Sequence, residues 1–270
     1  MSHHSDSAAR RFDQHVVAVV VAHDGARWLP HLISALEAST VFPDRLVAID
    51  TGSTDGSRDV LVQALGASSV YDAPAQTGFG AAVSTALKVS QLASVDSPSA
   101  DDGWVWLLHD DCAPAPDALE QLLAVATSDP SIAVLGGRIR AWPRARRLLE
   151  VGVTITGTGH RETGVEVGEY DQGQHDEQRE VLAVSSAGML VRRSVWEALH
   201  GFDPRLPLFR DDVDFGWRVA RSGHRVVVVP SAIVFHAEAA TRGVRGIANT
   251  SASPHLADRK AALFTLLANC

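Results

Sequence analysis

The segment VVAVVVAHDG at residues 16–25 sets the fold class of this chain. Its first seven residues are uninterrupted valine and alanine, whereas a strand with one face in water would alternate apolar and polar residues. Such a run is typical of a strand that is buried on both faces, as the inner strands of parallel sheets are. The run stops at His23 and Asp24, so two polar side chains follow directly at its carboxyl end.

Further strands are predicted along the first half of the chain, and most are separated by segments with apolar residues at helical spacing. They lie at 45–49 (RLVAI), 68–73 (SSVYDA), 104–109 (WVWLLH) and 132–137 (IAVLGG). A helix is expected from about Ala115, directly after the turn that follows the fourth strand. Repeated strand–helix units predict an α/β fold with a mostly parallel central sheet and flanking helices.

Polar residues stand where several of these strands end, and ligands of open α/β sheets bind at the carboxyl ends of strands. Two adjacent carboxylates at a strand end repel each other unless a cation joins them. A divalent metal held by one or two carboxylates and by substrate phosphates is a usual arrangement for Mg²⁺. A turn with helix-capping side chains would explain some of the same residues. The candidates are His23, Asp24, Asp50, His109, Asp110 and Asp111.

A second candidate region is LFRDDVDFGWRVARSGHRVVVVPSAIVFH at residues 208–236. Asp211, Asp212 and Asp214 crowd the expected start of a helix, and His236 ends the strand that follows. Carboxylates favour a helix N-terminus, but one carboxylate is enough for a cap. The pattern therefore favours a site that places a base beside a metal ligand.

Composition excludes several classes of protein. The 270 residues carry a net charge of −8 and a pI near 5.8, which argues against a nucleic-acid-binding surface. The two cysteines form no disulfide framework, so a cytoplasmic location is expected. The first residues lack the apolar core of a signal peptide, and no run approaches the ~20 apolar residues of a membrane span.

Five sequence blocks together resemble the family 2 glycosyltransferases. In chain order they are VVVAHDGARWLPHLISAL, VAIDTGSTDGSRDVL, QTGFGAAVSTAL, LLHDDCAPAPDAL and SSAGMLVRRSVWEALHGFDPRLPLFRDDVDFGWRVARSGHRVVVVPSAIVFH. They cover roughly residues 16–236, and DTGSTDGS and GFDPRLPLFRDDVDFGWR are the specific parts. The resemblance implies the GT-A fold, and it is strongest to bacterial members that transfer rhamnosyl or galactofuranosyl groups.

The resemblance implies where the donor nucleotide binds. In the family the nucleotide base lies at the end of the first strand, and an aspartate at the end of the second strand contacts it. Asp110, which directly precedes the implied metal ligand Asp111, is also expected to bind the nucleotide. The nucleotide-binding residues implied in this chain are Ala22, His23, Asp24, Asp50, Gly52 and Asp110.

The resemblance also implies a metal site and a base. The HDD sequence stands where the family has its D-x-D motif, so Asp111 is an implied metal ligand and His109 replaces the usual first acid. Asp211 and Asp212 stand where the family has a pair of acids whose second member is the base. His236 matches a histidine that some members use as a further metal ligand. An imidazole ligand tilts the preference from Mg²⁺ toward Mn²⁺.

The implied reaction is an inverting transfer of a sugar from a nucleoside diphosphate sugar, of UDP or dTDP type, to a glycan or a polyprenyl-lipid-linked acceptor. The chemistry needs a divalent cation to stabilise the diphosphate leaving group and a carboxylate to take the acceptor's proton. Two alternatives stay open. The changed D-x-D motif would suit a catalytically weak or inactive nucleotide-sugar-binding scaffold. A nucleotidyltransferase is disfavoured because AHDGARW lacks a glycine-rich, basic phosphate loop.

The chain is expected to divide into three parts. Residues 1–15 are predicted to be a disordered tail and 16–254 a single GT-A domain, within which the polar segment 156–180 is predicted to be a hairpin or a loop. Residues 255–270 are predicted to be an amphipathic helix, which packs on the domain or leads toward a membrane region. The enzyme would then act in the cytoplasm, at the inner face of the membrane.

Overall fold

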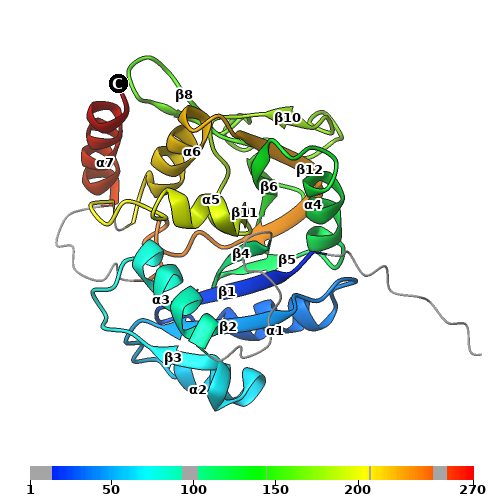
Figure 1. Cartoon of the computed structure of the whole chain (residues 1–270), viewed down its shortest axis with the longest axis vertical. Coiled ribbons are helices and arrows are strands. Elements are labelled where there is room, and N and C mark those ends of the chain that lie inside the picture. Colours follow the sequence, from blue (N-terminus) through cyan, green and yellow to red (C-terminus); the bar gives the residue numbers. More distant parts are fainter. Residues whose placement is uncertain (1–13, 93–102, 144, 207, 246–253) are drawn as a thin grey trace, which may run out of the picture.

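The strand β1 (Val16–Ala22) lies inside the central sheet of the computed structural model, which describes residues 14–92, 103–143, 145–206, 208–245 and 254–270 (Figure 1). It pairs in parallel with β2 (Arg45–Asp50) on one side and with β4 (Trp104–His109) on the other. β3 (Val70–Asp72) adds a further parallel strand beside β2. The predicted parallel sheet of the first half is therefore confirmed, and the expected tail falls almost wholly outside the described residues.

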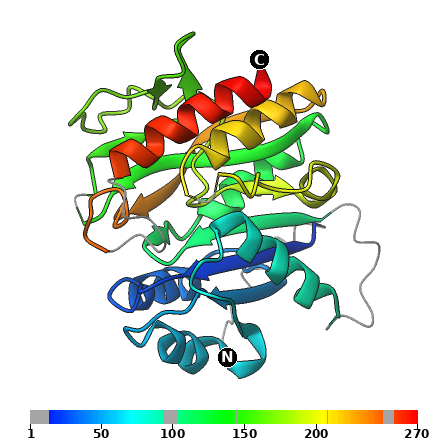
Figure 2. The same cartoon turned by 90° about the vertical axis from the view of Figure 1, so that its left-hand side faces the viewer.

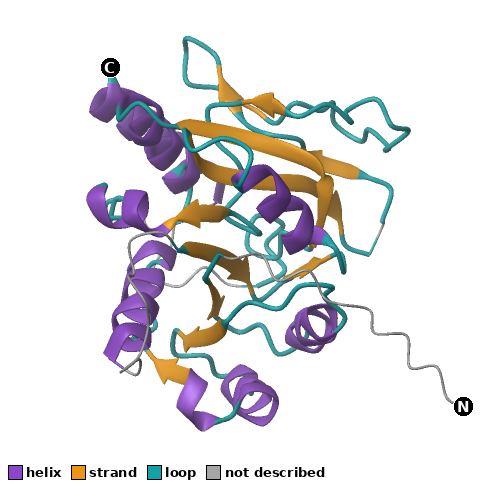
Figure 3. Ribbon diagram, turned by 45° about the vertical axis from the view of Figure 1, so that its right-hand side comes forward, coloured by secondary structure: helices purple, strands orange, loops and turns teal. Residues whose placement is uncertain are grey.

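Helices cover both faces of the central sheet, in which β1 is an inner strand, and this explains the uninterrupted apolar run of β1 (Figure 3). One face packs against α1 (Leu29–Glu37), α2 (Ser57–Leu65) and α4 (Ala118–Ala126). The opposite face packs against α3 (Phe79–Leu92), α5 (Arg193–Ala198) and α6 (Asp211–Arg221). Alternate residues of a strand point to opposite faces, so alternation with polar residues would leave polar groups buried under one layer of helices.

The second half of the chain makes the sheet mixed rather than mostly parallel. The strand order is β10-β12-β6-β11-β4-β1-β2-β3. β11 (Leu190–Arg192) runs antiparallel between β4 and β6 (Ile132–Ala141), and β6 pairs in parallel with β12 (Arg225–His236). β6 extends beyond its predicted end at Gly137, because β12 accompanies it through an irregularity between Val229 and Ile233. A Cβ at Gly137 would lie 2.2 Å from the carbonyl oxygen of Ala232, so only glycine fits there.

A short strand that the sequence did not suggest follows the HDD turn. β5 (Cys112–Pro114) pairs antiparallel with the end of β12, and Cys112 lies opposite His236. The helix expected from about Ala115 therefore begins only at Ala118. This pairing carries the end of β12 to the end of β4, although the two segments are far apart in sequence.

The polar segment 156–180 belongs to a hairpin and a sheet edge. β8 (Thr154–Ile155) pairs with β9 (Arg161–Glu162), while β10 (Arg179–Glu180) pairs with β12; β7 (Leu148–Glu150) pairs with β6. The predicted C-terminal helix is present as α7 (Pro254–Asn269), which packs along α6 (Figure 2). Among the described residues, no helix combines the length and apolar character needed to cross a bilayer.

Candidate active site

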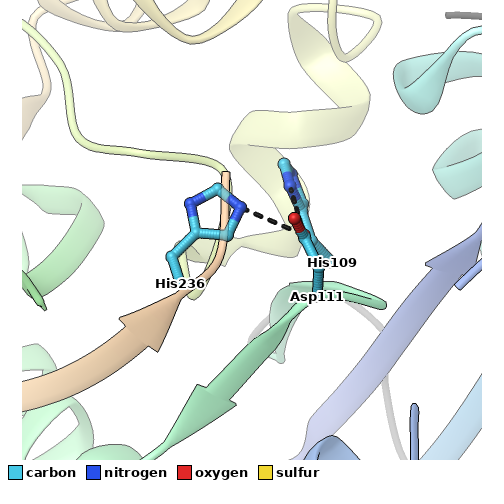
Figure 4. A group of neighbouring side chains, drawn as sticks. All are labelled: His109, Asp111 and His236. Carbon is cyan, nitrogen blue, oxygen red and sulfur yellow. Dashed lines mark hydrogen bonds and ion pairs between the residues drawn. The ribbon is translucent and has the colours of Figure 1, made fainter. Parts of the chain in front are cut away.

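His109, Asp111 and His236 meet at the carboxyl ends of β4 and β12 (Figure 4). His236 Nε2 lies 3.1 Å from Asp111 Oδ1, and His109 Nδ1 lies 4.0 Å from the same oxygen. One ligand atom from each residue lies within 4.8 Å of the others, so a single divalent ion can contact all three. The sequence predicted these residues, and the structure brings them together.

The protonation states of this cluster suit a metal. Burial, followed by repulsion from His236, lowers the pKa of His109 to about 3, so its imidazole is neutral near pH 7. If His109 Nε2 donates to Ser186 Oγ, 3.0 Å away, the lone pair of Nδ1 faces Asp111. Burial raises the pKa of Asp111, but the attraction of His236 outweighs it and the net pKa is lowered. Burial would lower the pKa of His236, but Asp111 outweighs it and the net pKa is raised, so a metal must displace the proton of His236 on binding. Two neutral imidazoles and one ionised carboxylate are then a donor set that fits Mn²⁺.

Asp110 points away from this cluster and joins β1 to the segment after β12. Its two oxygens accept from Arg245 Nη1 at 2.7 Å, and Oδ2 also accepts from the backbone N–H of His23 at 2.8 Å. Burial raises the pKa of Asp110 to about 6, although Arg245 opposes this shift. A Cβ at Gly25 would lie 2.3 Å from Asp110 Oδ2, so this approach requires glycine. Asp110 thus has partners within the protein.

The ends of β1 and β2 lie next to each other, because Ala22 is paired with Asp50. His23 Nδ1 lies 2.9 Å from the carbonyl oxygen of Thr51, and Asp24 Oδ1 accepts from the backbone N–H of Thr54 at 2.7 Å. Gly52 occupies the same turn with a φ of +67°. The residues expected to bind nucleotide at the first two strands therefore form one continuous surface.

Asp50 has an unused acceptor at this surface. Its Oδ2 accepts from the backbone N–H of Ser53 at 3.0 Å. Its Oδ1 is buried and has no hydrogen-bond partner among the residues that the structure describes. A buried carboxylate oxygen without a donor is costly, so this atom is suited to receive an N–H or O–H group of a ligand.

The acidic pair at the start of α6 is asymmetric. Asp212 Oδ1 lies 3.0 Å from Arg161 Nη1 and Oδ2 lies 2.8 Å from Arg161 Nη2, so the guanidinium holds both oxygens. Asp211 accepts from the backbone N–H of Asp212 at 3.0 Å. Burial and then the neighbouring Asp212 raise the pKa of Asp211 well above its ordinary value. Within the part of the chain that the structure describes, Asp212 is in an ion pair and Asp211 is not.

Asp214, the third aspartate of this region, forms contacts that stabilise the fold. Asp214 is buried, accepts from Arg218 Nη2 and Nε at 2.8 Å, and accepts from Asn269 Nδ2 at 2.8 Å. Asn269 is near the end of α7, so Asp214 fastens the C-terminal helix to α6. The three aspartates therefore have different surroundings. Asp212 pairs with Arg161, Asp211 is a buried carboxyl beside it, and Asp214 links α6 to α7.

A cavity of about 540 Å³ connects the two halves of the site. His236 lines one part of it, and Arg161 and Phe209 line another. His255 and Asp258 of α7 complete the lining. A substrate in this cavity can therefore approach both the histidine of the metal cluster and the arginine that holds Asp212. Sequence reasoning missed Arg161, which lies in the segment with the least periodicity.

Comparison with known proteins identifies the family to which this chain belongs. Residues 9–250 match the family described as "Glycosyltransferase like family 2". The N-acetylglucosaminyl-diphospho-decaprenol L-rhamnosyltransferase of Mycobacterium tuberculosis is 29% identical over 238 residues, which are 83% of this chain and 76% of that protein. The match supports the resemblance to rhamnosyl-transferring members.

Solved glycosyltransferases share the fold at low sequence identity. A mannosyltransferase of Pyrobaculum calidifontis, solved with GDP-Man and Mn²⁺, superimposes with a TM-score of 0.59 at 15% identity over 96% of this chain and 71% of its own. GalNAc-T7, solved with UDP, GalNAc and Mn²⁺, gives 0.60 at 15% identity over 83% of this chain, which spans 44% of that structure. The GT-A fold is thereby confirmed, and the chain is an enzyme that belongs to glycosyltransferase family 2.

Proposed function

We propose that this chain transfers a sugar from a nucleoside diphosphate sugar, of dTDP or UDP type, to a lipid-linked glycan acceptor, with inversion at the anomeric carbon. The observation that carries the proposal is the 540 Å³ cavity, which is lined by both His236 and Arg161. Inverting transfer needs the leaving group and the base on opposite sides of the reacting carbon. A cavity that reaches both His236 of the metal cluster and Arg161, the partner of Asp212, supports that arrangement.

The donor nucleotide is proposed to lie across the ends of β1 and β2. The free Oδ1 of Asp50 is suited to accept from the N–H of a pyrimidine base, because both partners would otherwise lack a hydrogen bond. His23, Asp24 and Gly52 line the same sheet edge, with Ala22 behind them. This surface leads directly to the HDD turn, so the diphosphate would follow the base toward the metal cluster.

His109, Asp111 and His236 would hold a divalent cation, for which Mn²⁺ is the preferred candidate. When bound, the ion supplies charge stabilisation to the diphosphate leaving group. Asp111 presents one oxygen to the two histidines, while its Oδ2 accepts from the backbone N–H of Ala239 at 2.8 Å. That second bond fixes the plane of the carboxylate and keeps the ligand oxygen directed into the cluster.

Asp212 is proposed to be the general base that takes the proton of the acceptor hydroxyl. It contacts Arg161 with both carboxylate oxygens, and Arg161 lines the cavity that His236 also lines. The pKa of Asp211 is raised by burial and by Asp212, which favours its protonated form, and a protonated carboxyl cannot take the proton of the acceptor. Asp110 is proposed to act on the nucleotide side by fixing the end of β1 and Arg245.

The acceptor is proposed to be lipid-linked, because the mycobacterial relative is named for a decaprenyl-diphosphate-linked sugar. α7 lines the cavity with His255 and exposes Leu256, Leu263 and Leu267 to solvent. Arg259 and Lys260 are exposed on the same helix. A helix with exposed leucines and basic residues is suited to rest on an anionic bilayer at the cytoplasmic face.

The decisive experiment incubates the protein with dTDP- and UDP-sugars, Mn²⁺ and N-acetylglucosaminyl-diphospho-polyprenol. The expected product is a disaccharide lipid whose new linkage has the anomeric configuration opposite to that of the donor, together with free nucleoside diphosphate. Formation should stop when a chelator removes the metal. An active enzyme that retains configuration would refute the single displacement, and binding of donor without any transfer would favour the scaffold alternative.

A further inference from the structure

Arg161 connects two buried carboxylates from different parts of the fold. It lies on β9, and its two Nη atoms contact Asp212 at 3.0 and 2.8 Å. Nη2 also contacts Glu150 Oε2, at the end of β7, at 2.7 Å. Glu150 Oε1 accepts from the backbone N–H of Ser185 at 2.7 Å. Every oxygen of the two carboxylates is therefore engaged, and one guanidinium joins them.

The charge of this arginine opposes the effect of burial in its surroundings. Burial would lower the pKa of Arg161, but Asp212 and Glu150 outweigh it and the net pKa is raised. Burial and then Arg161 act in opposite directions on Glu150, whose net pKa remains raised. Without the guanidinium, two buried carboxylates would face each other beside Asp211, and like charges in that position favour proton uptake. Arg161 therefore places a positive charge between two carboxylates in a buried position.

The geometry of the contact restricts the direction of Asp212 as well as its charge. A planar guanidinium that meets both oxygens of a carboxylate fixes the plane of that carboxylate, whereas a single contact does not. The backbone N–H of Val213 also donates to Asp212 Oδ1, at 2.8 Å. Oδ1 thus has two donors and Oδ2 one from the protein, so Oδ2 retains the larger capacity to accept a further proton.

The hairpin that carries Arg161 is itself held by α6 and α7. Arg210 Nη1 donates to the carbonyl oxygen of Gly159 at the hairpin tip, at 3.1 Å, and its Nε and Nη2 contact Asp258 of α7 at 2.6 and 2.9 Å. Gly159 has a φ of +79°, and a Cβ there would lie 2.6 Å from Leu266 Cδ1 of α7. Contacts with two helices therefore fix the position of a hairpin whose strands have only two residues each.

We propose that Arg161 is a positioning residue, which fixes the orientation of the Asp212 carboxylate and places a positive charge beside it, and that α7 supports Arg161 through the β8–β9 hairpin. This inference rests on the proposed role of Asp212 as base. It extends that role to a residue that no sequence motif marks. The charged and titratable groups that interact with the Asp212 carboxylate are Arg161 of the hairpin, Glu150 of β7 and Asp211 of α6. His160 of the hairpin and Asp258 of α7 line the cavity beside Arg161.

The test compares Arg161→Gln and Arg161→Lys with a matched control, Arg225→Gln. Arg225 also joins two carboxylates, Glu180 at 2.8 Å and Asp129 at 2.7 Å, but it does so at the opposite end of β12 from His236. Each variant is measured for melting temperature, for kcat, for the KM of donor and acceptor, and for the pH profile of kcat/KM. The control should match the wild type in all kinetic readouts.

We expect Arg161→Gln to lower kcat about ten- to a hundredfold, because loss of orientation at a base costs up to about that factor. The acid limb of its pH profile should move to higher pH, since removal of a cation favours proton uptake by the neighbouring carboxylates. Donor KM should stay within about threefold, because no donor contact changes. The kcat of Arg161→Lys should lie between those of the wild type and Arg161→Gln, since lysine supplies a positive charge but lacks the planar guanidinium that contacts both oxygens.

Distinct outcomes separate this inference from the proposed function. A folded Arg161→Gln with the wild-type kcat and pH profile overturns the inference alone, provided that Asp212→Asn is inactive. A higher acceptor KM with unchanged kcat and pH profile also overturns it, because Arg161 would then contact the acceptor. If Arg161→Gln fails to fold, Arg161→Lys decides, and a folded lysine variant with unchanged kcat overturns the two-point contact. An active Asp212→Asn refutes the proposed base instead.

Discussion

Replacement of Asp212 by asparagine is the sharpest test of the site, because the change removes one charge and almost no volume. The amide of the new side chain keeps an oxygen that can accept from the Val213 N–H and from one Nη of Arg161. It loses the acceptor that Oδ2 offers to the other Nη, at 2.8 Å. One charge-assisted hydrogen bond corresponds to about 1.5–3 kcal/mol.

Two features of the structure reduce that loss of stability. Arg161 retains Glu150 as a partner at 2.7 Å, so no cation is left unpaired in the interior. Asp211 loses the like charge that helps to raise its pKa, and this relieves a repulsion. We therefore expect the free energy of unfolding to fall by less than about 3 kcal/mol. For a chain of this size, about 1 kcal/mol corresponds to a shift of about 2–4 °C in melting temperature.

Turnover should respond far more strongly than stability. The amide cannot take the proton of the acceptor hydroxyl, and loss of general-base help costs at least about 10²-fold in kcat. The assay measures the initial rate of nucleoside diphosphate release with saturating donor, acceptor and Mn²⁺, and calorimetry measures donor affinity. Donor affinity should stay within about threefold of the wild type. A kcat within a few-fold of the wild type would refute the assignment and move the role to Asp211.

Three further predictions concern the metal, the acidic cluster and the C-terminal helix. In calorimetry, the wild type should bind the nucleotide more tightly with Mn²⁺ than with a chelator, and His236→Gln should remove most of this difference. Equal nucleotide affinities of the wild type with Mn²⁺ and with chelator would contradict the metal site. Asp214→Ala should lower the free energy of unfolding by roughly 2–4 kcal/mol, because Arg218 loses a buried partner, while the folded protein keeps kcat within a few-fold; a collapse of kcat would reverse this ranking. Leu263→Ser combined with Leu267→Ser should reduce co-sedimentation with anionic vesicles and leave transfer to a detergent-solubilised acceptor unchanged; undiminished vesicle binding would exclude the α7 face.

The correct parts of the sequence interpretation share a physical basis in local patterning. The run 16–22 had to be a strand buried on both faces, and the structure packs helices against both sides of it. Because parallel strands present their carboxyl ends at one sheet edge, His109 was expected near the end of β1 without any knowledge of the loops. The specific block around Asp211 and Asp212 was likewise recognisable from its letters alone.

Other features could not be read locally because they depend on pairings between distant segments. β5 is only three residues long and has no strand pattern of its own; it exists because β12 reaches it, and this pairing places His236 on Asp111 across 125 positions of sequence. The mixed sheet also follows from tertiary pairing, since β11 enters antiparallel between β4 and β6. A strand of three residues has too little sequence pattern to predict its direction or its neighbours in the sheet.

Periodicity and chain order predicted the α/β class and the polar residues at the strand ends, and the resemblance to the family implied the nucleotide and metal roles of those residues. The division of the three aspartates into an ion pair, a buried carboxyl and a contact with Asn269 of α7 became visible only in three dimensions. The same holds for Arg161, which reaches Asp212 across 51 positions from a segment without periodicity. The protonation of a buried group depends on the groups that lie near it in three dimensions. The spacing of residues along the chain does not show which carboxylate a distant guanidinium contacts.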